Sequence, residues 1–286
     1  MLMWCCKKRE KPIKVFIYTP WLTRKVYDLF NFIICFGVII PAAYFLKYQL
    51  NTCPHKINTT KPTNLNSGAD TEYHLAYRWL YTLTRRQDVF FQSPNMMERA
   101  ACEIFMWHKT LWVHLMFFAF VDIGFYLIYL LQNSTWLIDP HWQLLPMCIS
   151  IFYFLHPSAT LVVDGENSHH PRAILTLGLL LLWAFRLLHN YFRRENWHFG
   201  EREDWRYAEM RKNHGIFFTV SQFFVVNLAQ HGMLVGLTLP LSRAMESSGS
   251  ELNWIDCVAF LFCSAGIVIG FFADNQLHAY MNMKNK

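Results

Sequence analysis

Basic and amide side chains line one face of an apolar helix in the second half of the chain. Arg186, His189, Asn190 and Arg193 recur at three- and four-residue spacing, which places them on one helical face. Guanidinium groups held in this way bind the oxygens of an anion such as a phosphate group. The same spacing also fits a helix end at which Arg186 extends its charge to the lipid headgroups. The residues therefore indicate either an anion site or a membrane boundary.

A second set of polar side chains lies inside other apolar runs. Asn227, Gln230 and His231 share a helical face, and Asp122 stands in a separate apolar run. Amide and imidazole groups at such depth hydrogen-bond to a neighbouring helix, or they hold the polar end of a lipid-like substrate. A single carboxyl group there is expected to be neutral or paired. Both interpretations stay open from the residues alone.

Two further polar segments border the apolar runs. The block EREDWRY, residues 201–207, offers local ion pairs between Glu201, Asp204, Arg202 and Arg206, and its composition predicts a solvated helix on the membrane surface. Asp274, Asn275 and Gln276 follow directly after the last apolar run. They indicate either a polar helix end that leaves the membrane or a clamp for a ligand.

The composition places these side chains in a membrane protein. The chain of 286 residues is 53% hydrophobic and 16% charged, whereas a soluble domain has about 25% charged residues. Six runs reach the roughly 18 residues that a bilayer crossing requires. We predict an all-α, polytopic helical membrane protein of about six transmembrane helices. The predicted spans are Leu29–Leu46, Leu111–Leu131, Leu144–Val163, Ala173–Tyr191, Phe217–Leu241 and Trp254–Phe272.

The positions of Lys and Arg predict the orientation of these spans. Basic residues are concentrated before the first span, between the fourth and fifth, and after the sixth, so both termini are expected in the cytosol. The predicted parts are a basic cytosolic segment 1–28, a first span 29–46, a loop 47–110 and a helical bundle 111–286. Within the loop, residues 72–109 indicate interfacial amphipathic helices or one extra span.

Charge and cysteine content exclude several other classes. The net charge of +6 comes from segments that flank membrane spans, which suits contact with anionic membrane lipids and not with nucleic acid. The eight cysteines form no CxxC pair, and the sequence offers no metal site. Cys53 and Cys102 are the lumenal pair for which a disulfide is considered.

Three stretches carry a family resemblance: RRENWHFGEREDWRYAEMR, SQFFVVNLAQ and GIVIGFFADNQLHAYM. Together, over residues 161–286, the chain resembles an uncharacterised membrane family related to the steroid 5α-reductases. The resemblance implies a membrane-embedded reductase of the endoplasmic reticulum. Such an enzyme takes hydride from NADPH and reduces a carbon–carbon double bond in a lipid or sterol-like substrate.

The same resemblance implies roles for particular residues. Contact with the cofactor is expected from the following: Asp274, Asn275, Arg193, Arg186 and Arg206. The shared helical face of Asn227, Gln230 and His231, and not the resemblance, is the reason to expect contact with the substrate from these residues, and no catalytic residue is assigned. The steroid 5α-reductases carry an Asn four residues before the matching Asp, where this chain has Gly270.

One departure leaves the activity open. Members of the family usually continue into an SRHPNY-like segment and further apolar helices, whereas this sequence stops at Lys286. We therefore expect either a truncated reductase or a non-catalytic membrane protein that binds lipid or stabilises a partner. A relative of the isoprenylcysteine carboxyl methyltransferases is a third alternative. Binding of NADPH, of no nucleotide or of S-adenosylmethionine would distinguish the three.

Overall fold

The computed structural model describes residues 24–57, 94–163, 166–169, 171–200, 202–246 and 252–284. These residues form two compact units, one drawn from Met1–Ala42 and Val113–Lys286 and the other from Ala43–Trp112. The main helices are α1 (Arg24–Gly37), α2 (Ile40–Ile57), α5 (Pro94–Trp107), α6 (Lys109–Met116), α7 (Ile123–Gln132), α8 (Ile138–Leu155), α9 (Pro171–Arg194), α10 (Trp205–His214), α11 (Ile216–Gln222), α12 (Ala229–Glu246) and α13 (Trp254–Lys284).

The helical membrane architecture is confirmed. Within the described residues, five helices are long and apolar enough to cross a bilayer. They are Asp28–Cys53, Lys109–Gln132, Pro171–Arg194, Ile216–Met245 and Trp254–Lys284. The chain is therefore an integral, multi-pass membrane protein with an all-α membrane region. These helices correspond to the first, second, fourth, fifth and sixth predicted spans.

The third predicted span, Leu144–Val163, is not among these five helices, and its C-terminal end is wrong. Helix α8 ends at Leu155, because His156 precedes Pro157 and takes an extended conformation with ψ 139°. A residue before proline disfavours the helical region. A short 3₁₀ turn, Pro157–Ala159, follows, and strand β1 (Thr160–Val163) then pairs antiparallel with β2 (Glu166–His169). The last four residues of the predicted span therefore belong to a hairpin.

The first and last spans also differ from their predicted bounds. Helix α1 ends at Gly37 and α2 begins at Ile40, because Pro41 lacks an N–H group and its ring excludes a continuous helix. Helix α13 continues for twelve residues beyond Phe272, as far as Lys284. Asp274 therefore lies within a regular helix and not at its end.

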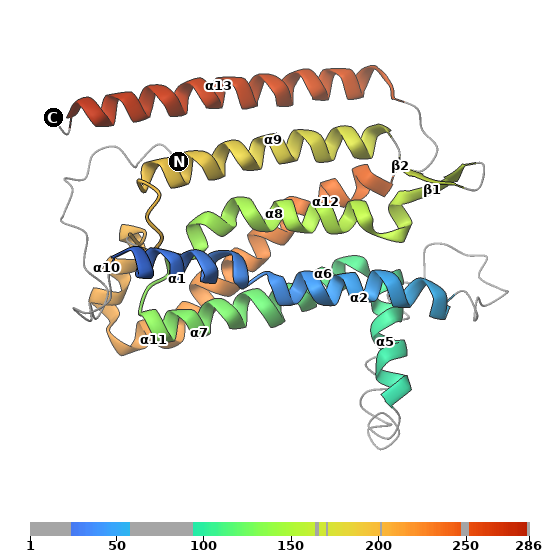
Figure 1. Ribbon diagram of the computed structural model, residues 1–286, viewed down its shortest axis with the longest axis horizontal. Coiled ribbons are helices and arrows are strands. Elements are labelled where there is room, and N and C mark those ends of the chain that lie inside the picture. The colour runs from blue at the N-terminus through green and yellow to red at the C-terminus, as the bar shows by residue number, and fades with distance from the viewer. Residues whose placement is uncertain are drawn as a thin grey trace. The chain divides into compact units, whose positions relative to one another are not determined.

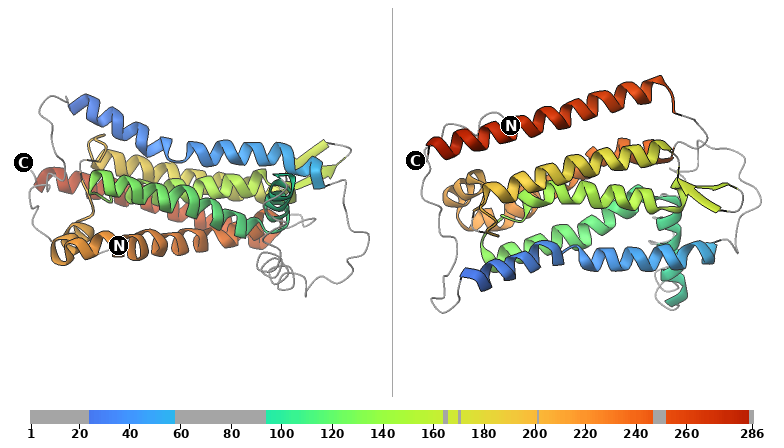
Figure 2. Two further views of the ribbon diagram at one scale, coloured as in Figure 1. Left: turned by 90° about the horizontal axis from the view of Figure 1, so that it is seen from below. Right: turned by 45° about the horizontal axis from the view of Figure 1, so that its top comes forward.

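Helix α9 lies between α13 and the rest of the larger unit. It packs between α13 on one side and α8 on the other, and α12 contacts both α8 and α9 (Figure 1; Figure 2). The buried hydrophobic side chains of α8 include Leu144, Leu145, Ile149 and Phe152. Helix α13 has no buried residue. Arg172 at the start of α9 pairs with Asp256 at the start of α13, and Arg186 further along α9 pairs with Asp274 further along α13, so these two helices run parallel.

Two membrane helices contain π-helical segments. Segment η3 (Phe117–Asp122) joins α6 to α7, and η5 (Phe223–Leu228) joins α11 to α12. Each is marked by an i→i−5 hydrogen bond, from Ile123 N to Phe118 O and from Ala229 N to Phe224 O. The two segments contact each other. Such segments rotate the following residues relative to an α-helix, and they are frequent at functional sites.

The smaller unit contains a disulfide. Cys53 on α2 is bonded to Cys102 on α5, which confirms the pairing considered from the sequence. Helix α5 lies within the region 72–109 where interfacial helices were predicted. Residues 72–93 lie outside the described residues, so the alternative of an extra span there stays open. The basic N-terminal residues 1–23 also lie outside them.

Replacing Cys102 by serine is expected to lower the free energy of unfolding by about 4 kcal/mol, because the bond closes a long loop. The two cysteines are 49 residues apart in sequence. The measurement is chemical denaturation of the purified chain. In parallel, Cys53 should react with a maleimide in Cys102→Ser but not in the wild-type chain. Equal labelling of Cys53 in both chains would show that the bond is absent.

Candidate functional site

Four of the five residues expected at a cofactor lie together between α9 and α13. The Arg186 guanidinium pairs with the Asp274 carboxylate at 2.6 Å. The Arg193 guanidinium donates to Asn275 Oδ1 at 2.6 Å and to Asn190 Oδ1 at 3.0 Å. We call Arg186, Arg193, Asp274 and Asn275 the arginine cluster. Its two arginines and one carboxylate leave one net positive charge.

Gly270 makes room for the arginine cluster. A Cβ atom at this position would lie 2.5 Å from Arg186 Nη1 and 2.9 Å from its Cζ. The guanidinium therefore rests against the backbone of α13, one turn before Asp274. The position at which the related reductases have Asn is here occupied by the Arg186 side chain.

The fifth expected cofactor residue has other partners. Arg206 donates to both carboxylate oxygens of Asp204, with Nη2 2.6 Å from Oδ2. Asp204 is the N-cap of α10 and also accepts from the backbone N–H of Arg206. A carboxylate at this position satisfies a free backbone donor of the helix. These contacts of Arg206 thus belong to a helix cap, and they do not include the arginine cluster.

The polar residues of the second and fifth predicted spans meet in the bundle. His231 Nδ1 lies 2.6 Å from Asp122 Oδ2, and His231 Nε2 lies 2.9 Å from His114 Nδ1. Asn227 donates to the backbone carbonyl of Asp122 at 2.9 Å and accepts from Gln222. These contacts confirm that the polar face bonds to a neighbouring helix. Its expected contact with a substrate stays a prediction. We call Asp122, His231 and His114 the histidine–aspartate chain.

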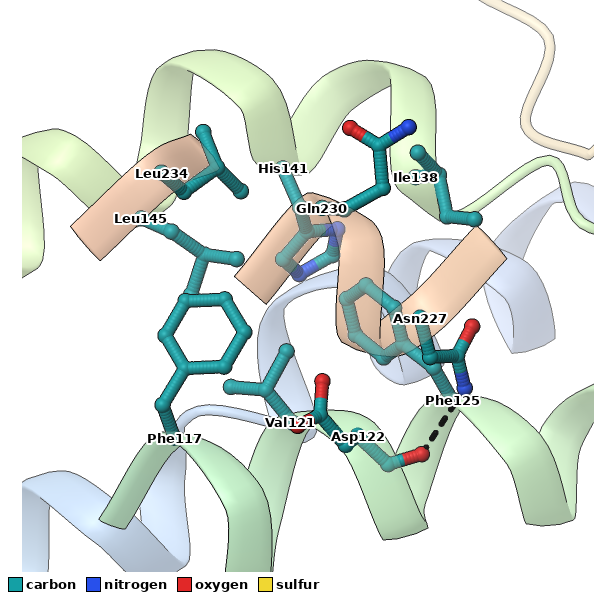
Figure 3. Close-up of a pocket in the computed structure, with 10 residues that line it drawn as sticks. All are labelled: Phe117, Val121, Asp122, Phe125, Ile138, His141, Leu145, Asn227, Gln230 and Leu234. Carbon is teal, nitrogen blue, oxygen red and sulfur yellow. Dashed lines mark hydrogen bonds between the residues drawn. The ribbon is translucent and has the colours of Figure 1, made fainter. Parts of the chain in front are cut away.

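A small cavity lies beside the histidine–aspartate chain. Asp122 and Asn227 lie on one side of it, and His141 of α8 lies across from them among apolar side chains (Figure 3). The volume of the cavity that the centre of a water molecule can occupy is about 10 Å³. The cavity therefore has space for about one water molecule. As it stands, the cavity would hold one small polar group and not a whole lipid. Its lining is Phe117, Val121, Asp122, Phe125, Ile138, His141, Leu145, Asn227, Gln230 and Leu234.

Gln230 connects the cavity to the surface helix α10. Its Nε2 donates to the Tyr207 hydroxyl at 3.1 Å, and its buried Oε1 has no hydrogen-bond partner among the described residues. His141 is fully buried, its Nδ1 lies 2.7 Å from the Leu137 carbonyl, and its Nε2 has no hydrogen bond there either. A carbonyl oxygen only accepts, so Nδ1 of His141 carries the proton. Gln230 Oε1 is therefore an acceptor atom of the lining that is not yet satisfied among the described residues.

The EREDWRY block is only in part the solvated face that its composition predicts, because Arg202 and Arg206 are exposed whereas the side chains of Glu203 and Asp204 are buried. The Glu203 side chain is 2% exposed and pairs with Arg211. Its Oε1 also accepts from the backbone N–H and the hydroxyl of Thr135, each at 2.7 Å. Arg202 pairs with Glu195, whose side chain is 6% exposed, and Glu201 lies outside the described residues. Charges are buried here because they bind α10 to the loop between α7 and α8.

Asp139 makes the stability of this region depend on pH. This residue lies at the start of α8, outside the five candidate spans. Burial, and secondly the negative charge of Asp204, raise the pKa of Asp139 from 3.8 to about 7. The folded chain therefore binds this proton more tightly than the unfolded chain does. Its contribution to stability is present below pH 4 and is lost as the pH rises toward 7.

Asp139→Asn is expected to remove that contribution, which amounts to at most about 4 kcal/mol. The measurement is the free energy of unfolding at pH 5 and at pH 7.5. The difference between the two pH values should be smaller in the variant than in the wild-type chain. An identical pH dependence in both chains would contradict the assignment to Asp139.

Several residues of these sites were not singled out from the sequence. His114, His141 and Tyr207 are contacts of predicted residues, but they lie on other helices. A histidine within an apolar run is itself a signal, since polar groups at membrane depth are rare. His114, inside the predicted second span, carried that signal. His141 lies outside the predicted spans and carried none. Tyr207 belongs to the EREDWRY block, whose composition does not show its contact with Gln230.

The fold and these sites define a multi-pass helical membrane protein with buried polar clusters. Residues 125–286 match the family described as "Protein of unknown function (DUF1295)". The chain belongs to this family, which is the uncharacterised group resembling the steroid 5α-reductases. The family match begins at residue 125, whereas the resemblance seen in the sequence was expected to begin at residue 161.

One curated relative supports the assignment without naming an activity. It is an uncharacterized protein of Schizosaccharomyces pombe, 25% identical over 178 residues. The alignment covers 57% of this chain and 49% of the relative, so the chain spans about half of the relative's length. No solved structure matches the chain.

Proposed function

We propose that this chain is a membrane-embedded reductase that binds NADPH and reduces a carbon–carbon double bond in a lipid or sterol-like substrate. The observation that carries the proposal is the arginine cluster. Arg186 and Arg193 from α9 meet Asp274 and Asn275 from α13, although 81 to 88 residues separate the partners. Cofactor contact had been predicted for these four residues, with Asp274 matched to the related reductases and the two arginines placed on one helical face by their spacing.

The arginine cluster fits a phosphate group of the cofactor. Arg186 and Arg193 each keep a buried Nε atom without a hydrogen-bond partner among the described residues. A guanidinium with a free N–H can donate to a phosphate oxygen while its other nitrogens keep their protein partners. The net positive charge of the cluster favours an anion. Arg186 and Arg193 would thus hold the cofactor's phosphates.

The remaining chemistry is divided between cofactor and protein. When bound, NADPH supplies the hydride that adds to the β-carbon of an enone. The protein positions the substrate and supplies a proton, since reduction of a double bond consumes both. Asn227, Gln230 and His231 lie at or beside the cavity, whose size suits a carbonyl group. The aromatic and aliphatic lining keeps other water out, which strengthens hydrogen bonds to that group.

A direct test uses NADPH carrying deuterium on the nicotinamide. The purified chain in lipid nanodiscs is incubated with a panel of enone lipids, and the products are examined by mass spectrometry. A saturated product that carries one deuterium on carbon supports the proposal. Unchanged lipids throughout the panel, from a chain that binds NADPH, would contradict it for those substrate classes.

The alternative is a non-catalytic membrane protein that binds lipid or a partner. The Arg186–Asp274 pair favours it, because an ion pair between α9 and α13 also serves to hold two helices together. This alternative predicts that NADPH does not bind, while loss of the pair still weakens the packing of α13.

The disulfide supports a proposal for the orientation in the membrane. Cys53 ends the span Asp28–Cys53, and disulfides persist in oxidising compartments such as the lumen of the endoplasmic reticulum. The opposite end of this span carries Asp28, which pairs with His198 just after α9. We therefore propose that Arg193 and Arg194 lie on the cytosolic side, in agreement with the distribution of Lys and Arg. The cytosolic location of both termini stays a prediction, because it requires α8 to cross the membrane in addition to the five helices. Residence in the endoplasmic reticulum is proposed from the family resemblance.

A further inference from the structure

The histidine–aspartate chain joins two depths of one membrane helix. His114 and Asp122 both belong to the span Lys109–Gln132. At 1.5 Å per residue, His114 lies about 8 Å from the Lys109 end and Asp122 about 20 Å from it. Asp122 is thus near the middle of a bilayer whose core is about 30 Å thick. His231 from α12 bridges the two side chains.

The hydrogen bonds of the histidine–aspartate chain allow one proton to be shared between its two ends. Charge is costly at this depth, so the three groups are expected to be neutral in sum. One neutral arrangement has Asp122 ionised, His231 neutral with its proton on Nδ1, and His114 doubly protonated. Moving one proton along each hydrogen bond gives a second neutral arrangement, with Asp122 protonated and both histidines neutral. The two arrangements differ only in which end holds the proton.

The surroundings place the two ends in different environments. The Asp122 side chain is 1% exposed and lines the cavity, whereas His114 is partly exposed on α6. The π-helical segments η3 and η5 contain Asp122 and Asn227, and His231 follows shortly after η5. The side-chain amide of Asn227 donates a hydrogen bond to the backbone carbonyl of Asp122. The other titratable side chain that lines the cavity is His141 of α8.

We infer that His114, His231 and Asp122 form a proton relay that delivers a proton to the cavity. This inference rests on the proposed reduction, which would consume the proton. As hydride forms the new C–H bond at the β-carbon of an enone, the double bond moves to the α-carbon and the carbonyl carbon. The carbonyl oxygen takes the proton of Asp122. The resulting enol loses this proton and gains one at the α-carbon, so the net addition is one hydride and one proton.

The relay separates the sources of the two hydrogens. Gln132 ends the span that contains His114, and its side-chain amide donates to Asn31. Asn31 lies three residues after Asp28, which pairs with His198 just after α9. The arginine cluster therefore lies toward the same membrane surface as Gln132, and His114 lies toward the opposite membrane surface. The cofactor would approach from the cytosolic side. The proton would be taken up at the other side and passed inward.

The test follows the protonation of the three groups without any substrate. The full chain in lipid nanodiscs is examined by ¹⁵N NMR of the histidine rings and by infrared spectroscopy of the Asp122 carboxyl, assigned through Asp122→Asn. The relay predicts that the signals of His114, His231 and Asp122 all change at one common pH. In His114→Gln, which alters a partly exposed side chain, the Asp122 signal should no longer change at that pH. His141→Gln is the matched control and should leave the common step in place.

The outcomes separate the relay from the reductase. Independent titration of His114 and Asp122 in the wild-type chain would overturn the relay, whatever the cofactor result. NADPH binding is measured on the same preparations. A common titration step in a chain that does not bind NADPH would support proton sharing and contradict the reductase. Binding of NADPH without a common step would leave the reductase in place and require another proton donor.

Discussion

Replacing Glu203 by alanine is expected to lower the free energy of unfolding by about 3–5 kcal/mol, the cost of removing one partner of a buried ion pair. Its carboxylate is 2% exposed and pairs with Arg211. Without it, the Arg211 guanidinium would remain against the rings of Tyr129 and Phe218 with no carboxylate partner. Thr135 would also lose the acceptor of its backbone N–H. The measurement is chemical denaturation in detergent.

A matched control lies on the following helix. Glu209 is an exposed carboxylate on α10, and Glu209→Ala should cost less than about 1 kcal/mol. Glu203→Gln should be intermediate, because the amide oxygen still accepts from Thr135 but carries no charge for Arg211. Equal, small effects of Glu203→Ala and Glu209→Ala would show that the EREDWRY block is a solvated face after all.

Replacing Gly270 by alanine is expected to weaken NADPH binding by about 10- to 100-fold, the range for losing one charged hydrogen bond. The new Cβ would lie 2.5 Å from Arg186 Nη1. The end of the arginine side chain is flexible and would move away, so the cost in stability is small. The moved guanidinium would no longer be held by Asp274. Binding is measured by fluorescence titration of the chain in nanodiscs.

Gly266 provides the control for this substitution. It lies one turn earlier on α13, and a Cβ atom there would meet nothing within 4 Å. Gly266→Ala should leave NADPH affinity unchanged and stabilise the helix by about 0.4–1 kcal/mol. If both alanine variants bind NADPH as the wild-type chain does, the placement of Arg186 does not contribute to the cofactor site.

Much of the membrane architecture and one face of α9 could be predicted from the sequence. Apolar runs of bilayer length locate helices because the bilayer leaves backbone groups no other partners. Arg186 and Arg193 were placed on one face by spacing alone. Their partners Asp274 and Asn275 came from the family resemblance, since spacing within one helix cannot show what the facing helix brings to it.

The buried contacts could not be predicted, for identifiable reasons. Asp122 meets His231 beside the π-helical segments η3 and η5, and these change the register that a 3.6-residue period assumes. Glu203 and Arg211 have the composition of a surface helix, and only the position of Thr135 reveals that the pair is buried. The early end of α8 could have been predicted from the sequence, because the residue before Pro157 disfavours the helical conformation.

The central claim is that the arginine cluster binds NADPH, and calorimetric titration of the nanodisc-embedded chain tests it most directly. The account predicts saturable binding in the wild-type chain and in Arg194→Gln, whose arginine is 42% exposed and pairs with Glu195 outside the cluster. In Arg193→Gln the affinity should fall by about tenfold or more. A well-folded wild-type chain that shows no binding, or equal affinity in all three chains, would contradict the cofactor site and favour a non-catalytic membrane protein.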